Sequence, residues 1–242
     1  MSKPVLLLLP GLLCDVAVWH KQMDALSTYE CVVPDYGMAD SIAAMAEVAI
    51  AALPAGNFAV AGHSMGGRVA LEIARRIPER VARIALLDTG MHPLATGDAG
   101  AREVAGRMAL LQKARTQGMR AMGQEWARGM VRESCLETPL FEEILAMIER
   151  KTPDIFAAQL KALIERPDAR DVLAGLAVPV LLSCGRQDNW SPVARHEEML
   201  ALCPQARLRV IEDSGHMSTM EQPQAVTQML RDWLEEGNRA SA

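Results

Sequence analysis

Residues 58–67 read Phe-Ala-Val-Ala-Gly-His-Ser-Met-Gly-Gly, and they determine how the rest of the chain is interpreted. The run Phe58–Ala61 is continuously apolar, which is typical of a strand buried on both faces. The segment Met65–Arg76 has the apolar spacing of an amphipathic helix and ends before Pro78. The turn between them fits the pattern G-x-S-x-G, in which a serine hydroxyl is exposed at a strand-to-helix turn. Ser64 is therefore a candidate nucleophile.

Short apolar runs alternate with amphipathic segments along most of the chain. Five further strands are expected at Val5–Leu9, Glu30–Val33, Ala82–Leu87, Pro179–Ser183 and Leu208–Ile211. Helices are expected at Val18–Leu26, from a cap at Ser41 to Leu53, at Val193–Leu202 and at Gln224–Glu235. Alternation of strands and helices is typical of a parallel sheet with right-handed crossovers. The sequence therefore predicts an α/β fold with a six-stranded, mainly parallel sheet flanked by helices.

The alternation stops between residues 92 and 170, where no convincing strand is present. The apolar spacing of this segment predicts four helices, at Ala101–Arg115, Met119–Val131, Leu140–Arg150 and Pro153–Glu165. We expect these helices to form a cap inserted after the fourth strand. The predicted organisation is a core made of residues 1–91 and 171–242, with residues 92–170 as an all-helical cap.

The composition of the 242 residues excludes several classes of protein. Half of the residues are hydrophobic and 23% are charged, which is typical of a globular protein. A net charge of −5 gives no overall basic surface for nucleic acid, and no apolar run approaches the ~18 residues of a membrane span. The run Val5–Leu9 is too short for the apolar part of a signal peptide. The five widely spaced cysteines indicate reduced thiols and no metal site, so we expect a cytoplasmic protein.

In a parallel sheet, functional loops follow the carboxyl ends of the strands. A serine nucleophile needs a base that removes its proton, and His216 follows the last predicted strand. The flexible Gly215 before it suits a side chain that must reach another strand end. The other histidines fit less well. His20 is expected on a helix surface, His63 inside the turn, His92 at the start of the insertion and His196 on a solvated helix.

The base in turn needs a carboxylate that orients it and stabilises its cation. Asp188 follows the strand Pro179–Ser183, and Asp88 ends the strand before the insertion. Asp188 gives the chain order Ser64, Asp188, His216, which is the order expected for a serine on this strand–turn–helix motif, and it is the preferred acid. Asp88 stays as the alternative.

Two N–H donors are needed for the negative charge that develops on a substrate carbonyl oxygen. The first is the backbone N–H of Met65, because it follows the nucleophile and opens a helix with a favourable dipole. The second is expected from the loop Pro10-Gly11-Leu12-Leu13 after the first strand, with Leu12 N–H as the candidate. Leu12 and Met65 are thus the predicted oxyanion hole.

Together these residues resemble the α/β-hydrolase family. The resemblance extends over about Val5–Trp233 and is most specific in three segments, Gly62–Gly67, Gly185–Asp188 and Ser214–His216. It is greatest with capped members: carboxylesterases, enol-lactonases, carbon–carbon bond hydrolases and pimeloyl-carrier-protein methyl ester esterases. Two departures stand out. Pro10-Gly11 replaces the His-Gly that many members carry after the first conserved strand, and no antiparallel hairpin is expected before that strand.

The resemblance implies acyl transfer to water through an acyl-enzyme, without a metal or organic cofactor. The primary expectation is a serine hydrolase for carboxylic esters with small to medium acyl or alkyl groups. One alternative keeps the triad and cleaves an enol-lactone or the carbon–carbon bond of a vinylogous diketone. A second alternative is a non-catalytic ligand receptor on the same fold, although no triad residue is missing from this chain.

The cap segment also suggests contacts with the substrate. Trp126 within it, and Trp190 just after Asp188, are candidates for lining the pocket, with packing as the alternative role. Residues 100–132 carry seven basic and two acidic side chains, so this segment has a charge of +5 in a chain of charge −5. A basic cap would attract an anionic small-molecule ester or an ester linked to a carrier protein, although a solvated helix face explains the same pattern.

Overall fold

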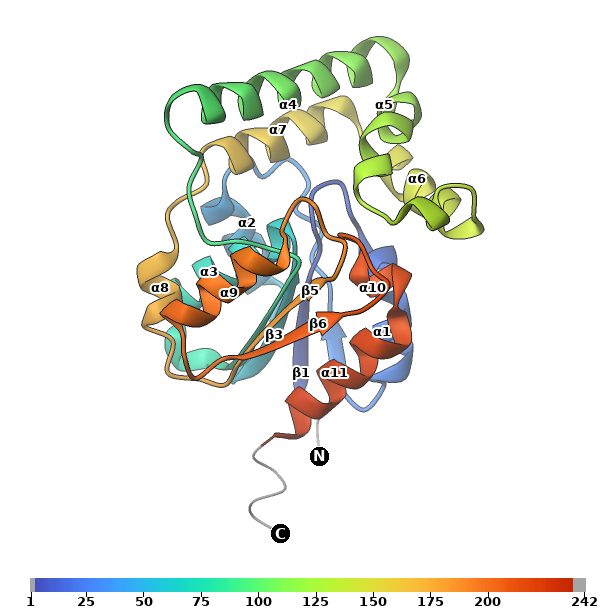
Figure 1. The fold of residues 1–242 in the computed structure, drawn as a ribbon. Helices are drawn as coiled ribbons and strands as arrows, with labels where there is room; N and C mark the ends of the chain where they lie inside the picture. The colour runs from blue at the N-terminus through green and yellow to red at the C-terminus, as the bar shows by residue number, and fades with distance from the viewer. Residues whose placement is uncertain (1–2, 237–242) are drawn as a thin grey trace.

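A computed structural model of the chain describes residues 3–236 (Figure 1). Six parallel strands form one sheet in the order β2-β1-β3-β4-β5-β6. The strands are β1 Val5–Leu9, β2 Glu30–Val32, β3 Phe58–His63, β4 Val81–Leu87, β5 Val180–Gly185 and β6 Arg207–Ile211. Leu6–Leu9 and most of β3 are fully buried, as the continuous apolar runs predict. The predicted six-stranded sheet is confirmed, and all of its strand pairs are parallel.

Helices cover both faces of this sheet (Figure 1). One layer contains α2 Ile42–Ala51, α3 Met65–Arg76, α8 Arg170–Ala174 and α9 Val193–Leu202. The other contains α1 His20–Ala25, α10 Ser218–Glu221 and α11 Pro223–Glu235. Ser41 caps α2 as predicted, because its hydroxyl accepts from Ala44 N–H at 3.1 Å. The short helices α8 and α10 were not predicted, because segments of five and four residues show no helical periodicity.

Four helices between β4 and α8 lie across the carboxyl ends of the strands (Figure 1). They are α4 Gly97–Gln117, α5 Met119–Trp126, α6 Pro139–Glu149 and α7 Pro153–Ile164. Helix α4 packs on α5 and α7, and α5 packs on α6. Ala169 N–H donates to Met91 O at 2.9 Å, so the two ends of this helical segment meet beside the sheet. Within the described residues, no helix is both long enough and apolar enough to cross a membrane.

Short 3-10 turns account for most differences from the predicted helix ends. The helix expected at Val18–Leu26 is a turn at Val16–Trp19 followed by α1. The helix expected at Met119–Val131 ends at Trp126 and continues as a turn at Ala127–Gly129. Two further turns span Pro78–Arg80 and Glu133–Cys135.

Candidate active site

Ser64 lies at the turn between β3 and α3. Its φ of 55° and ψ of −117° form a strained conformation for a residue with a side chain. Neighbouring groups hold it there: Ser64 N–H donates to Leu87 O at 2.8 Å, and the Thr89 hydroxyl donates to Ser64 O at 2.6 Å. A Cβ on Gly62 would lie 2.3 Å from Gly66 O, so the turn requires glycine there. The strain therefore fixes the direction of the Ser64 hydroxyl.

Ser64, His216 and Asp188 form one hydrogen-bonded chain at the carboxyl ends of β3, β6 and β5. Ser64 Oγ is 2.8 Å from His216 Nε2, and His216 Nδ1 is 2.8 Å from Asp188 Oδ2. The other carboxylate oxygen, Asp188 Oδ1, accepts from the backbone N–H groups of Trp190 (2.8 Å) and Ser191 (2.9 Å). Because Nδ1–H donates to a carboxylate, Nε2 is left to accept the Ser64 hydroxyl proton.

The electrostatics of this pair favour an ionised Asp188 beside a more basic His216. Burial by itself raises the pKa of Asp188, but His216 and the two backbone donors outweigh burial and lower it. Burial lowers the pKa of His216, but the Asp188 carboxylate outweighs that effect, and the pKa is raised. The imidazole is therefore a stronger base than a free histidine.

Asp88, the alternative acid, has different partners. Its Oδ1 accepts from Gly185 N–H at 2.9 Å, and its Oδ2 accepts from the Ser218 hydroxyl. Burial, and then the nearby carboxylate of Asp188, raise the pKa of Asp88 well above its usual range. Asp88 is therefore a buried carboxyl group whose hydrogen bonds go to Gly185 and Ser218, and Asp188 is the acid that contacts His216.

Two histidines that the sequence did not favour are buried near this chain. His63 Nε2–H donates to His216 O at 2.8 Å, and burial together with His216 lowers the pKa of His63 to about 3. A neutral His63 thus supports the loop of His216. The expectation that His196 is solvated is wrong, because α9 packs on β5 and β6 and leaves this side chain fully buried. Burial lowers the pKa of His196 to about 4.

The two expected oxyanion donors lie beside Ser64. Met65 N–H opens α3, and Leu12 lies in the loop after β1. A Cβ on Gly11 would be 3.2 Å from Ser64 Cβ, so this loop runs directly past the serine. Within residues 3–236, neither Leu12 N–H nor Met65 N–H has an acceptor. Both groups are therefore available to a molecule that enters the site.

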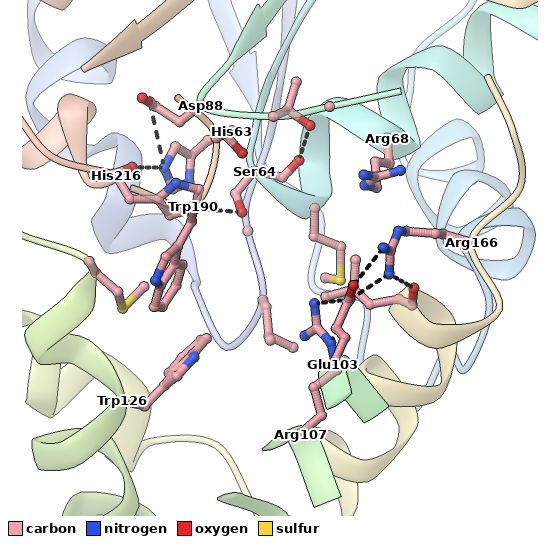
Figure 2. A pocket seen from close by; sticks show the side chains of 18 of the residues that line it. His63, Ser64, Arg68, Asp88, Glu103, Arg107, Trp126, Arg166, Trp190 and His216 are labelled. Carbon is pink, nitrogen blue, oxygen red and sulfur yellow. Dashed lines mark hydrogen bonds and ion pairs between the residues drawn. The ribbon is translucent and has the colours of Figure 1, made fainter. Parts of the chain in front are cut away.

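Ser64 and His216 open into a cavity of about 490 Å³ between the sheet and the helices above it (Figure 2). The same cavity is lined by four other predicted site residues, Leu12, Met65, Trp126 and Trp190. The indole rings of Trp126 and Trp190 stack with centroids 5.4 Å apart, and the Trp190 ring is 5.0 Å from the His216 ring. No group of His, Cys, Asp or Glu side chains in the described part of the chain has the arrangement of a metal site.

Contacts from the helical segment that the sequence did not indicate hold the loops of the site. Gln159 Oε1, on α7, accepts from Leu13 N–H at 2.8 Å, next to the candidate oxyanion donor. Met130 O accepts from His216 N–H at 2.7 Å. These two contacts join residues more than 80 positions apart, so they leave no local sequence signal. Nearer in the chain, the Glu221 carboxylate on α10 accepts from the N–H of the residue before His216 at 2.9 Å.

The basic segment 100–132 divides into two parts. Lys113 pairs with Glu125, and Arg120 pairs with carboxylates of α6, so part of the positive charge is neutralised. Arg102 and Arg107 line the cavity instead. The basic pattern is therefore in part a solvated helix face and in part a feature of the site.

Comparisons with known proteins agree with the fold. A sequence profile of the alpha/beta hydrolase fold family matches residues 4–223. The pimeloyl-[acyl-carrier protein] methyl ester esterase of Nitrosomonas europaea is 27% identical over 240 residues, which cover 91% of this chain and 92% of that protein. A thermophilic esterase from Thermogutta terrifontis, solved with malate bound, is 29% identical with a TM-score of 0.85, covering 97% of this chain and 90% of the other. The enol-lactonase of Burkholderia xenovorans LB400 shares the fold at 22% identity with a TM-score of 0.84, over 98% of this chain and 93% of the other.

The parallel sheet, the strained serine turn and the family match lead to one assignment. The chain belongs to the α/β-hydrolase family, as its motifs predict. Its relatives include named esterases, and it is an enzyme of the hydrolase class.

Proposed function

We propose that the protein is a serine hydrolase that cleaves carboxylic esters, with Ser64, His216 and Asp188 as its catalytic triad. The observation that supports this most strongly is the continuous chain of two 2.8 Å hydrogen bonds from Ser64 Oγ through His216 to Asp188. Its serine end opens into a cavity, and its carboxylate end is buried and has a lowered pKa. This is the arrangement that activates a hydroxyl group for attack on a carbonyl carbon.

In the acylation half of the reaction, Ser64 Oγ attacks the ester carbonyl while His216 Nε2 takes the hydroxyl proton. The carboxylate of Asp188 stabilises the imidazolium that forms. His216 then donates this proton to the leaving alkoxide, and the alcohol departs. Water, activated by the same imidazole, attacks the acyl-enzyme and releases the acid and the free Ser64 hydroxyl.

Leu12 N–H and Met65 N–H form the oxyanion hole in this proposal. Neither group has an acceptor in the described part of the chain, and the loop that carries Leu12 runs past Ser64. An oxyanion bound by both donors would also lie at the N-terminus of α3, where the helix dipole favours negative charge. The loss of one such donor typically costs about 2.7–4 kcal/mol of transition-state stabilisation.

Residues 92–170 are proposed to act as a cap over the triad, with Trp126 and Trp190 in contact with the substrate. A cavity of about 490 Å³ is within the range of small-molecule sites, so small to medium esters fit. The relative from Nitrosomonas europaea is named for a methyl ester on a carrier-linked acyl chain. Small methyl esters are therefore the first substrates to test.

The experiment is labelling with a fluorophosphonate together with hydrolysis of p-nitrophenyl acetate. The protein should be labelled at Ser64, and Ser64→Ala should lose both the label and at least ~10,000-fold in kcat. Ser27→Ala, at an exposed serine between α1 and β2 that does not line the cavity, is the control and should keep both. Folded protein that takes no label would indicate a ligand receptor, and full activity in Ser64→Ala would exclude the proposed nucleophile.

A further inference from the structure

The cavity has an arginine wall beside the catalytic residues. We use this name for five side chains that line the cavity, Arg68, Arg102, Arg107, Arg166 and Arg195. Figure 2 shows Arg68, Arg107 and Arg166 grouped with Glu103 on one side of the cavity, while His216 and the two tryptophans lie on the other. Five positive groups at one small-molecule cavity are unexpected in a chain with a net charge of −5.

Glu103 neutralises only part of the arginine wall. Its carboxylate binds Arg166 through two hydrogen bonds of 2.8 and 3.0 Å. It also accepts from Arg107 at 2.9 and 3.0 Å. Both oxygens of the Glu103 carboxylate therefore accept from guanidinium groups, and the carboxylate holds Arg107 and Arg166 in place. Asp88 also lines the cavity, but its carboxyl oxygens accept from Gly185 N–H and the Ser218 hydroxyl, and not from an arginine of the wall.

Arg68 and Arg195 have no such partner. Arg68 Nη1 donates to His92 O and Arg195 Nη1 donates to Trp190 O, each at 2.8 Å. Among the ion pairs formed within residues 3–236, none includes Arg68 or Arg195. Both side chains approach Gly90, where an added Cβ would lie 2.8 Å from Arg195 Cδ and 3.4 Å from Arg68 Nη2. Two unpaired guanidinium groups thus converge on one part of the cavity wall.

This convergence carries an electrostatic cost. Burial, followed by the guanidinium groups of Arg166 and Arg195, lowers the pKa of Arg68 to about 9. Arg68 still carries its charge at neutral pH, and the Glu103 carboxylate offsets only part of the repulsion that it feels from the neighbouring guanidinium groups. An anion bound there would offset the repulsion, and carboxylates match guanidinium groups in geometry as well as charge.

We propose that Arg68 and Arg195 form a carboxylate-binding subsite, and that the substrates are half-esters of short dicarboxylic acids. This inference rests on the proposed ester hydrolysis at Ser64. Arg68 is four residues beyond Ser64 on α3, which corresponds to about 6 Å of axial rise. The chain between the scissile carbonyl and the carboxylate is therefore short, as in half-esters of succinate, glutarate and adipate.

The test compares monomethyl glutarate with dimethyl glutarate, which has nearly the same shape and no charge. The wild-type protein should prefer the half-ester in kcat/KM by roughly 10- to 100-fold, the value of one or two charge-assisted hydrogen bonds. Arg195→Gln and Arg68→Gln should each reduce this ratio about tenfold or more. The control Arg209→Gln removes an exposed arginine on β6, away from the cavity, and should leave the ratio unchanged.

Two outcomes would overturn the subsite. One is a wild-type ratio near or below one, and the other is a ratio that survives in both Arg68→Gln and Arg195→Gln. If one variant does not fold, the other still decides, because the two arginines come from separate helices. Failure of the subsite is distinct from failure of the proposed function, since the latter would appear as Ser64-independent cleavage of neutral p-nitrophenyl acetate.

Inhibition distinguishes a carboxylate from a phosphate as the bound anion. Glutarate should compete with p-nitrophenyl acetate, and its inhibition constant should rise about tenfold or more in Arg195→Gln. Inorganic phosphate should inhibit more weakly than glutarate. Stronger inhibition by phosphate that depends on the same arginines would contradict the assignment to dicarboxylate half-esters and indicate phosphorylated substrates instead.

Discussion

The two sides of the cavity satisfy their polar groups in opposite ways. On the catalytic side, the oxygens of Asp188 receive three hydrogen bonds, and both ring nitrogens of His216 have partners within the protein. On the arginine wall, Arg68 and Arg195 bond to carbonyl oxygens, and neither forms an ion pair within residues 3–236. The triad side chains are therefore paired without a ligand, whereas these two guanidinium groups are not.

This difference reflects the charge that each side is expected to meet. An ester carbonyl arrives neutral and becomes negative only in the transition state, so the groups beside it must already be positioned. A substrate carboxylate arrives with its charge, so its binding site gains from positive groups that lack an internal partner. The first side would determine kcat, and the second would determine which ester is preferred.

The largest effect should come from the acid of the proposed triad. Asp188→Asn replaces the acceptor of His216 Nδ1–H with an amide, which disfavours the reactive tautomer, and kcat for p-nitrophenyl acetate should fall about 10,000-fold. The matched change is Asp88→Asn at the other buried strand-end carboxyl. Because Asp88 bonds Gly185 N–H and the Ser218 hydroxyl and, within residues 3–236, makes no hydrogen bond to Ser64, His216 or Asp188, its amide should cost less than about tenfold.

The two aspartates make this a direct comparison within one protein. Both variants are isosteric, and circular dichroism with thermal unfolding would establish that both are folded. A large loss in Asp88→Asn together with a small loss in Asp188→Asn would contradict the assignment of Asp188 and move the acid to the end of β4.

The pH dependence should depend on the catalytic side alone. The reaction needs a neutral His216, so kcat/KM for a neutral ester should fall tenfold per pH unit below the pKa of His216. Because Asp188 raises this pKa, the limb should lie above the ordinary histidine value of about 6.5. In Asp188→Asn the imidazolium loses its stabilising charge, so the residual activity should show the limb at lower pH.

The arginine variants provide the control for this profile. Arg195 donates to Trp190 O and, within residues 3–236, makes no hydrogen bond to His216 or Asp188, so Arg195→Gln should leave the limb within a few tenths of a unit. If the pH limb shifted in Arg195→Gln but not in Asp188→Asn, the pKa of the base would be set by Arg195, which would contradict the assignment of Asp188 as its partner.

The catalytic side could be predicted from the sequence because each of its residues follows a predicted strand. Ser64, Asp188 and His216 lie after three short strands, and parallel strands bring their carboxyl ends to one edge. The structure places the three side chains in the predicted line, while their catalytic role stays a prediction. The fold was predictable for the same reason, except for helices too short to show periodicity.

The arginine wall could not be predicted in this way. Its members come from α3, α4, α9 and the segment after α7, and each one lies in a stretch that resembles an ordinary charged helix face. The same limit explains the error at His196, whose charged neighbours Arg195 and Glu197 suggested a solvated position. Only the packing of α9 against the sheet turns Arg195 toward the cavity and buries His196.

The smallest expected effect is the salt dependence of the two esters. The net charge of −5 should repel an anionic substrate, whereas the basic segment over the cavity should attract it. Added salt screens both fields, so the sign of the change shows which one the substrate experiences. Between about 0.05 and 0.5 M NaCl, kcat/KM for monomethyl glutarate should fall roughly two- to fivefold, while the value for dimethyl glutarate should stay nearly constant. An increase for the half-ester would mean that the acidic body of the molecule, and not the arginine wall, dominates the approach of the substrate.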